Sequence, residues 1–211
     1  MGMWSWISVA LAGYVSIYSF KKNDKKQSLI FKVVALGLLC LLLITHSSTV
    51  SASGQWIFAS LIVSIVADWL HCFRPYSKVS FCSFLVAQLM VSKAFWLQLS
   101  GTIVWWMPAL LIATGIVAFF LLLPQLDKLI FPVMVMGLVL LQMAWAAGEA
   151  WLKIGTTPSL FGFLGSIAFI ISWLTVAIHE RRQEIKGAVY LISGFYFLAQ
   201  CFVVQAVLIV N

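Results

Sequence analysis

Charged residues are scarce in this chain, and their scarcity excludes most soluble proteins. Only 9% of the 211 residues are charged, whereas a soluble globular domain has about a quarter. Hydrophobic residues make up 63% of the chain, and the mean hydropathy is +1.06. The composition therefore predicts an integral membrane protein.

Motifs for metal binding, phosphate binding and nucleophilic catalysis are also missing. The four cysteines form no CxxC pair, and the histidines lack metal-ligand spacing, so we expect neither a metal nor another cofactor. The sequence contains no glycine-rich phosphate loop and no nucleophile elbow. The formal charge of +7 does not indicate nucleic-acid binding, because the basic residues fall in short loops rather than in a stripe interleaved with aromatics. We expect anionic membrane lipids as their partners.

Eight apolar runs are long enough to cross a bilayer, which takes roughly 17–25 residues per helix. No basic segment precedes the first run, so we expect it to be a spanning helix and not a cleaved signal peptide. The gaps between runs are too short for a soluble domain, so residues 1–211 are predicted to form a single all-α bundle of eight transmembrane helices. The runs are Met3–Phe20, Leu29–Thr45, Trp56–Phe73, Val79–Gln98, Val104–Leu123, Leu129–Ala147, Ser159–Ile178 and Gly187–Val210.

Basic residues gather in the odd-numbered connections between these runs, while the even-numbered connections carry only Lys153. By the positive-inside rule the odd-numbered connections are cytoplasmic, and both termini lie outside. Lys32 and Asp68 then lie toward the cytoplasmic ends of their helices. The basic residues of the odd-numbered connections are Lys21, Lys22, Lys25, Lys26, Arg74, Lys78, Lys128, Arg181, Arg182 and Lys186.

The third and fourth runs resemble the seventh and eighth. Asp68-Trp69-Leu70 matches Ser172-Trp173-Leu174, and FLVAQ (84–88) matches YFLAQ (196–200). A parallel four-plus-four duplication would produce this similarity, and chance resemblance between hydrophobic helices is the alternative. Under duplication, Ser172 is the counterpart of Asp68, and Gln88 that of Gln200.

Asp68 interrupts the third run together with Ser60 and Ser64, at four-residue intervals that place all three on one helical face. An ionisable side chain at membrane depth is costly, so it usually faces a protein or water-filled interior and marks a functional site. The alternative is a structural acid paired with a lysine from a neighbouring helix. For Lys32, at the start of the second run, three roles are open: reaching out to lipid headgroups, binding a phosphate or pairing with Asp68.

Further polar residues recur on the fourth, seventh and eighth runs. Such stripes most often serve helix packing, although an amide at membrane depth must find partners. Together they can line one central polar cavity that Asp68 faces. Glu149 is interpreted as an interfacial anchor, with Lys93 as one candidate partner. The cavity residues are Gln88, Ser172, Tyr196 and Gln200.

Several local motifs follow one another in order and cover nearly the whole chain. They are Phe31-Lys32, SIVAD (64–68), LLLPQLDKLIFPV (121–133), WAAGEAW (145–151) and YFLAQ (196–200). With these motifs the sequence resembles the YhhN family of polytopic membrane proteins, which includes the lysoplasmalogenases. The resemblance implies a multi-pass protein of the bacterial inner (plasma) membrane.

The resemblance implies hydrolysis of the vinyl-ether bond of a lysoplasmalogen, a lyso-ether phospholipid, to a fatty aldehyde and a glycerophospho-alcohol. Protonating the distal alkene carbon gives an oxocarbenium ion, which water captures, so the site needs a proton donor and a second group that activates water. Asp68 matches the family's first acid and is assigned as the donor, with Ser64 orienting it. Lys32 is assigned to the lipid phosphate.

The sequence departs from the family pattern at three positions. The family's second acid falls near Ser172-Trp173, where neither residue is acidic; Gln88 replaces a histidine, and Ala67 replaces the glycine before Asp68. Losing one member of an acid–base pair lowers the reaction rate by about 10²–10⁴-fold. The alternatives are therefore a family member that binds or transports lipid without cleaving it, or a proton-coupled transporter that uses Asp68.

Overall fold

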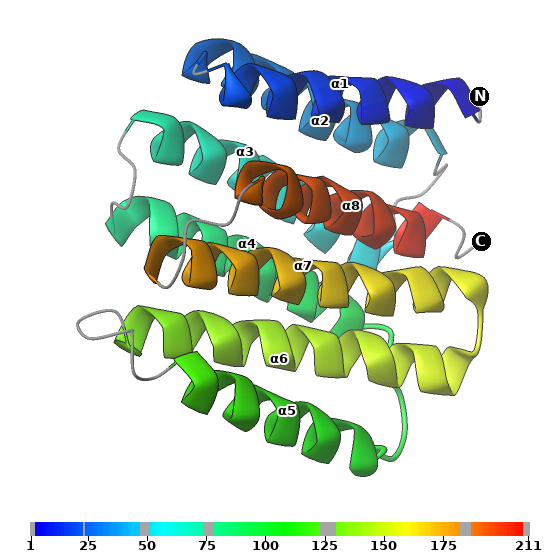
Figure 1. The fold of residues 1–211 in the computed structure, drawn as a ribbon. Coiled ribbons are helices and arrows are strands. Elements are labelled where there is room, and N and C mark those ends of the chain that lie inside the picture. The colour runs from blue at the N-terminus through cyan, green and yellow to red at the C-terminus, as the bar shows by residue number, and fades with distance from the viewer. Residues whose placement is uncertain are drawn as a thin grey trace.

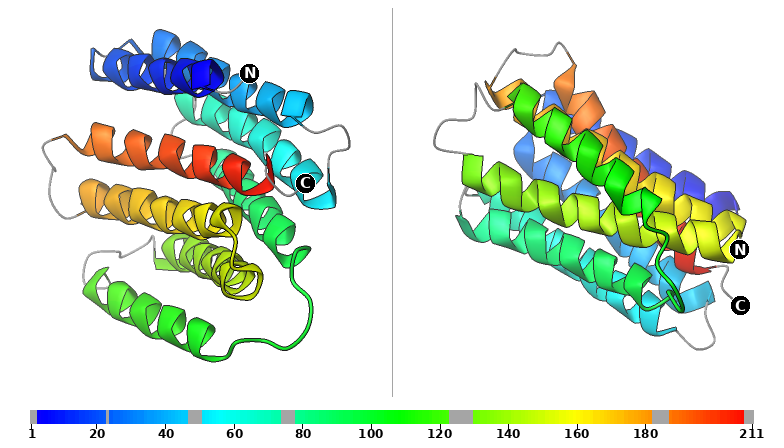
Figure 2. Two further views of the ribbon diagram at one scale, coloured as in Figure 1. Left: turned by 90° about the vertical axis from the view of Figure 1, so that its right-hand side faces the viewer. Right: turned by 90° about the horizontal axis from the view of Figure 1, so that it is seen from below.

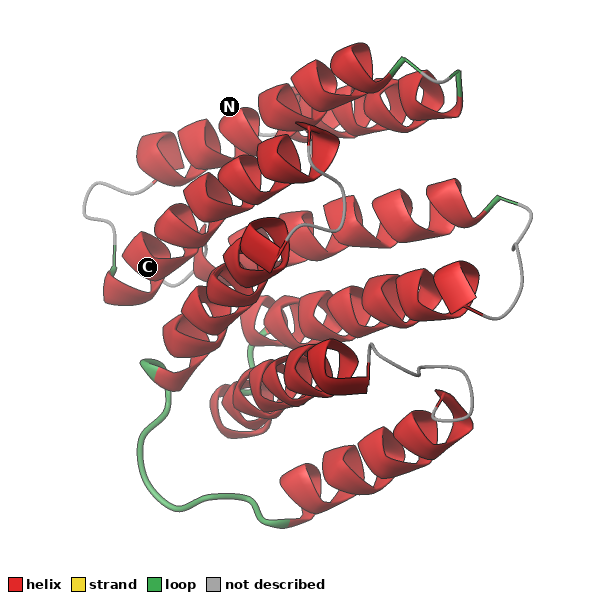
Figure 3. Cartoon of the chain, turned by 90° about the vertical axis from the view of Figure 1, so that its left-hand side faces the viewer, coloured by secondary structure: helices red, strands yellow, loops and turns green. Residues whose placement is uncertain are grey.

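The structure, a computed structural model, describes residues 3–22, 24–46, 51–73, 78–122, 130–181 and 187–208. Within these ranges every regular element is an α-helix (Figure 3). Helices suit so apolar a chain because they satisfy all backbone hydrogen bonds within one segment. The helices are α1 (Met3–Lys21), α2 (Lys25–His46), α3 (Ala52–Phe73), α4 (Lys78–Trp96), α5 (Trp106–Leu122), α6 (Ile130–Ile154), α7 (Thr157–Arg181) and α8 (Ala188–Leu208).

Six of the described helices are long and apolar enough to cross a bilayer, namely α2, α3, α4, α6, α7 and α8. Helix α5 contributes a shorter apolar stretch, Trp106–Phe120, and α1 is not among the six. The predicted all-α membrane bundle is thus confirmed. Eight crossings, the outside location of both termini and the four-plus-four duplication stay predictions.

Most consecutive helices pack side by side, most extensively as the pairs α1–α2, α3–α4 and α7–α8, whereas α4 packs on α6 rather than on α5. Helix α8 also contacts α1, α2 and α3, and Figure 1 shows it between the α1–α2 pair and α7. Helix α5 lies at the edge of the bundle and packs on α6. Helix α1 begins and α8 ends at the same end of the bundle (Figure 2). The arrangement brings α2, α3 and α8 together although they are far apart in the sequence.

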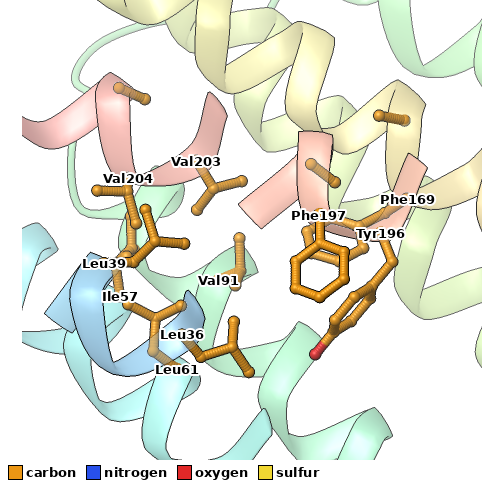
Figure 4. Close-up of a cluster of buried hydrophobic side chains, with 14 of the residues drawn as sticks. Leu36, Leu39, Ile57, Leu61, Val91, Phe169, Tyr196, Phe197, Val203 and Val204 are labelled. Carbon is orange, nitrogen blue, oxygen red and sulfur yellow. The ribbon is translucent and has the colours of Figure 1, made fainter. Parts of the chain in front are cut away.

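A cluster of buried apolar side chains joins α2, α3, α4, α7 and α8 (Figure 4). Close approach of α7 to its neighbours depends on glycine: a Cβ on Gly165 would lie 3.2 Å from the carbonyl oxygen of Ala199 in α8. Small residues allow such approach, which drives helix association where lipid is as apolar as the protein. The cluster includes Leu36, Leu39, Ile57, Leu61, Val91, Phe169, Tyr196, Phe197, Val203 and Val204.

Several helix boundaries differ from the predicted runs. Helix α6 continues past Ala147 to Ile154, α2 begins at Lys25 rather than Leu29, and α3 begins at Ala52 rather than Trp56. Charged residues were expected to end an apolar run, but Glu149 is buried with an ion-pair partner one turn later, Lys153. The charged part of α6 therefore extends the helix instead of ending it.

Candidate functional site

Asp68 lies in the last two turns of α3 and is almost completely buried. Its carboxylate Oδ1 accepts a hydrogen bond from the Lys32 ammonium of α2 at 2.7 Å. The side chain of Lys32 is 24% exposed and that of Asp68 only 2%. The ion pair thus joins a buried acid to a cation that is reachable from outside the bundle.

Tyr196 of α8 holds the other oxygen of the same carboxylate. Its hydroxyl donates to Asp68 Oδ2 at 3.0 Å, and the Lys32 ammonium lies 4.6 Å from the centre of its ring. The ring packs edge-on against Phe169 and Phe197, and Figure 4 shows the hydroxyl pointing away from both. Both oxygens of the carboxyl group thus have a hydrogen-bond partner from another helix, and the ammonium group also lies over an aromatic face.

Ser64 and Gln200 form the inner end of this cluster. Ser64 lies one turn before Asp68 on α3, and its hydroxyl accepts a hydrogen bond from Gln200 Nε2 of α8 at 3.4 Å. Both residues also lie beside the hydroxyl of Tyr196. The amide oxygen of Gln200 is buried and has no hydrogen-bond partner among the described residues.

Of the seven predicted site residues, five meet in this cluster: Lys32, Ser64, Asp68, Tyr196 and Gln200. The pair between Lys32 and Asp68, one of the alternatives raised by the sequence, is formed. Exposed His71, on the last turn of α3, interacts electrostatically with both members of the pair.

The two other predicted residues are placed differently. Ser172 of α7 is buried, and its hydroxyl donates to the carbonyl oxygen of Ile192 in α8 at 2.8 Å. Helix packing accounts for that bond. Gln88 of α4 is 1% exposed, and its amide oxygen has no partner in the described part of the chain.

Glu149 is not the interfacial anchor that the sequence suggested. It is fully buried in α6, where it accepts hydrogen bonds from the Trp145 indole at 2.8 Å and the Val104 backbone amide at 3.1 Å. Its ion-pair partner is Lys153, at 3.0 Å, rather than the exposed Lys93. Lys153 also donates to the carbonyl oxygen of Ser100. Glu149 therefore ties the end of α6 to the connection before α5.

Comparison with known proteins agrees with the resemblance seen in the motifs. The YhhN family model matches residues 27–207. The chain belongs to the YhhN family. It is 27% identical over 184 residues to membrane proteins named YhhN, described as uncharacterised, from Escherichia coli O6:H1, Escherichia coli O157:H7 and Shigella flexneri. The match covers 86% of this chain and 88% of each relative. No solved structure matches the chain.

Membership of this family, with enterobacterial relatives that are membrane proteins, agrees with the six described helices able to cross a bilayer. The chain is a multi-pass membrane protein of the bacterial inner membrane. Most of the YhhN-like motif residues considered above are described, except that the connection 123–129 within LLLPQLDKLIFPV lies outside the described residues.

Sequence reasoning did not include Trp96 among the polar residues of α4. Trp96 continues the row begun by Gln88 and Ser92 on α4, and its buried indole nitrogen also lacks a hydrogen-bond partner among the described residues. A tryptophan near a helix end suggests an interfacial residue. The signal that would have found it is the repeated four-residue spacing.

No group of three or more histidine, cysteine, aspartate or glutamate side chains in the described ranges is arranged to hold a metal ion. The chemistry that the described cluster offers is that of a carboxylic acid, an ammonium group, a phenol and an amide.

Proposed function

We propose that this YhhN-family protein hydrolyses the vinyl-ether bond of a lysoplasmalogen, releasing a fatty aldehyde and a glycerophospho-alcohol. The observation that carries the proposal is the pair of Asp68 and Lys32. A buried acid lies 2.7 Å from a cation whose side chain is partly exposed. A proton donor and an anchor for phosphate are thus adjacent, as a single-chain phospholipid requires.

When the lipid binds, Lys32 would leave the Asp68 carboxyl group and bind the lipid phosphate instead. The Asp68 carboxyl group is held by Lys32 at Oδ1 and by Tyr196 at Oδ2. A lipid phosphate that takes the ammonium of Lys32 frees Oδ1, and this oxygen would carry the proton that is transferred to the substrate.

The reaction follows from these positions. Asp68 protonates the alkene carbon distal to the ether oxygen, and the adjacent carbon becomes an oxocarbenium centre. Water adds to that centre and returns a proton to Asp68, and the resulting hemiacetal collapses to aldehyde and alcohol. Ser64 and Tyr196 would hold the carboxyl group in position. The unpartnered amide oxygen of Gln200 would accept a hydrogen bond from the attacking water.

A second candidate function is lipid binding or transport without cleavage. It is favoured by Ser172, which stands where the family's second acid falls and is engaged by the Ile192 carbonyl. Of the other carboxylates whose side chains are described, Asp24 binds the backbone amide of Gln27, and Glu149 binds within its own helix and to Val104. Neither supplies the missing acid.

Aldehyde release decides between the two functions. Wild type, Asp68→Asn and Glu149→Gln would be purified in detergent, checked for folding and incubated with lysoplasmenylethanolamine. Release by wild type and Glu149→Gln, but not by Asp68→Asn, is expected. If folded wild type releases no aldehyde while a family member with both acids does, the enzyme function is rejected. A stabilising shift in the melting temperature with the same lipid would then support binding.

A further inference from the structure

Four buried polar atoms have no hydrogen-bond partner among the described residues, and three of them form a row on α4. They are the amide oxygen of Gln88, the hydroxyl of Ser92 and the indole nitrogen of Trp96. Gln88 and Ser92 are at most 2% exposed. Because they recur every four residues, all three lie near one face of the helix. The fourth atom is the amide oxygen of Gln200 on α8.

Such groups need partners. Leaving a buried donor or acceptor unpaired costs about 1–3 kcal/mol, and buried polar groups in folded proteins are bonded to protein or to ordered water. Lipid tails offer no hydrogen bonds, so the cost cannot be recovered from the bilayer. Water bound inside a protein supplies such partners where the site is polar.

The chemistry of the row fits water. It offers an acceptor at Gln88, a hydroxyl that donates and accepts at Ser92, and a donor at Trp96. Successive members are separated by about 6 Å along the helix axis. Two hydrogen bonds of about 2.8 Å, at the roughly tetrahedral angle of a water molecule, span less than that distance, so a continuous file takes more than one water molecule per gap.

The row leads away from the Lys32 end of the bundle. Helix α4 begins near the end of α3, where Asp68 lies, and finishes at Trp96 near the opposite end. There Trp96 packs edge-on against Trp145, with ring centres 5.2 Å apart. The Trp145 indole donates to Glu149, whose partner Lys153 has a side chain that is 22% exposed. The outer end of the row is therefore close to a polar, partly exposed position.

The inner end of the row lies at about the same depth in the bundle as Gln200. A Cβ on Gly162 of α7 would lie 2.7 Å from Phe95 of α4 and 3.3 Å from Ala206 of α8, so the three helices converge there. Helices α4 and α8 run in the same direction, as the course of the chain in Figure 1 shows. Two turns before Phe95 lies Gln88, and the corresponding step back from Ala206 reaches Ala199, next to Gln200. Both amides thus lie at a similar depth.

We propose that Gln88, Ser92 and Trp96 hold a file of bound water that enters from the end opposite Lys32 and reaches the level of Gln200, where it supplies the water consumed at the Asp68 site. The supply role rests on the proposed hydrolase function, whereas hydration of the row does not. A lipid phosphate held by Lys32 would occupy the opening at the other end. Water therefore requires a separate route to the oxocarbenium carbon.

Hydration is tested by NMR on protein in lipid nanodiscs with ¹⁵N-labelled tryptophan indoles. The Trp96 resonance, assigned with Trp96→Phe, is expected to exchange magnetisation with water. The internal comparison is Trp145, whose indole hydrogen is already bonded to Glu149 and is expected to show less transfer than that of Trp96. Ser92→Ala should reduce the transfer to Trp96 about fivefold, the equivalent of one hydrogen bond. The matched Ser83→Ala, which removes an exposed hydroxyl bonded to the Val79 carbonyl of the same helix, should leave it unchanged.

If Trp96 shows as little transfer as Trp145, the water file is rejected. The supply role is tested separately by aldehyde release. Ser92→Ala is expected to lower kcat about fivefold with KM unchanged, because water adds after the lipid has bound. An active wild type whose Ser92→Ala variant keeps the full kcat would overturn the supply role. A hydrated row in a folded wild type that releases no aldehyde would reject the hydrolase function and the supply role, while leaving the hydration confirmed.

Discussion

Two buried carboxylates, Asp68 and Glu149, are held in different ways. Glu149 is bound by Trp145 and Lys153, each one turn away on α6, and by the backbone of Val104. Asp68 is bound by Lys32 and Tyr196, which are 36 and 128 residues away and belong to two other helices. Two of the contacts of Glu149 lie within α6, and the third fixes that helix to the connection before α5. The contacts of Asp68 involve a partly exposed cation that can change partners.

The partners of the two buried acids separate a structural role from the proposed functional one. Glu149 is bound by an indole, a backbone amide and an ammonium group, all of them protein groups. The Asp68 cluster instead includes the free amide oxygen of Gln200. A buried acid within a membrane is expected to be functional; under the proposed function that role belongs to Asp68, whereas the contacts of Glu149 serve the fold.

The largest expected effect is that of Asp68→Asn on aldehyde release. The amide keeps the shape of the side chain but cannot supply the proton, so kcat should fall by about 10²–10⁴-fold. A lipid-induced shift in melting temperature should persist, which shows that the variant is folded. A folded Asp68→Asn variant with wild-type kcat would remove Asp68 from the mechanism.

Lys32→Gln should weaken lipid binding more than it slows the chemical step. Losing a charge-assisted hydrogen bond to phosphate, about 1.5–3 kcal/mol, corresponds to an increase in KM of about 10- to 100-fold. Lys93→Gln, which changes an exposed lysine of α4, is the matched control and should leave KM unchanged. Equal KM values for Lys32→Gln and wild type would contradict phosphate binding by Lys32.

Glu149→Gln should affect stability rather than activity. The substitution weakens charge-assisted hydrogen bonds to Trp145 and Lys153, so the free energy of unfolding should fall by about 1–3 kcal/mol. Equilibrium unfolding in mixed micelles measures the change. Aldehyde release per folded molecule should match that of wild type, and a strong loss there would place Glu149 in the reaction.

Tyr196→Phe should produce the smallest effect of the four. It removes the hydrogen bond from the phenol to Asp68 Oδ2 while keeping the ring between Phe169 and Phe197. A single such bond contributes about 1 kcal/mol, so kcat should fall about fivefold with little change in unfolding. Loss comparable to that of Asp68→Asn would mean that Tyr196 itself transfers a proton.

Sequence reasoning predicted the helical bundle because the length of each apolar run and the short connections carry that information directly. It also selected Asp68, since one carboxylate in an apolar run stands out. The predicted end of α6 and the predicted role of Glu149 were wrong. The sequence does not show that Trp145, Val104 and Lys153 supply partners for the Glu149 carboxylate.

The membership of the site was harder to predict because it depends on which helices meet. Lys32 and Tyr196 contact Asp68 because α2, α3 and α8 pack together. These residues are 36 and 128 positions away from Asp68 in the sequence, so no local pattern predicts the contacts. Ser172 shares the position of Asp68 in the internal match, but its hydroxyl binds the Ile192 carbonyl. The matching position of Ser172 in the possible repeat therefore did not predict that it would contact the Asp68 cluster.

The central claim is that the carboxylate held across helices acts on substrate and the carboxylate held within its helix supports the fold. The most direct test measures aldehyde release from lysoplasmenylethanolamine and the free energy of unfolding side by side for Asp68→Asn and Glu149→Gln. The account predicts opposite outcomes: Asp68→Asn loses release and remains folded, whereas Glu149→Gln keeps release and loses stability. Equal losses of release in the two variants, or full release by a folded Asp68→Asn, would contradict it.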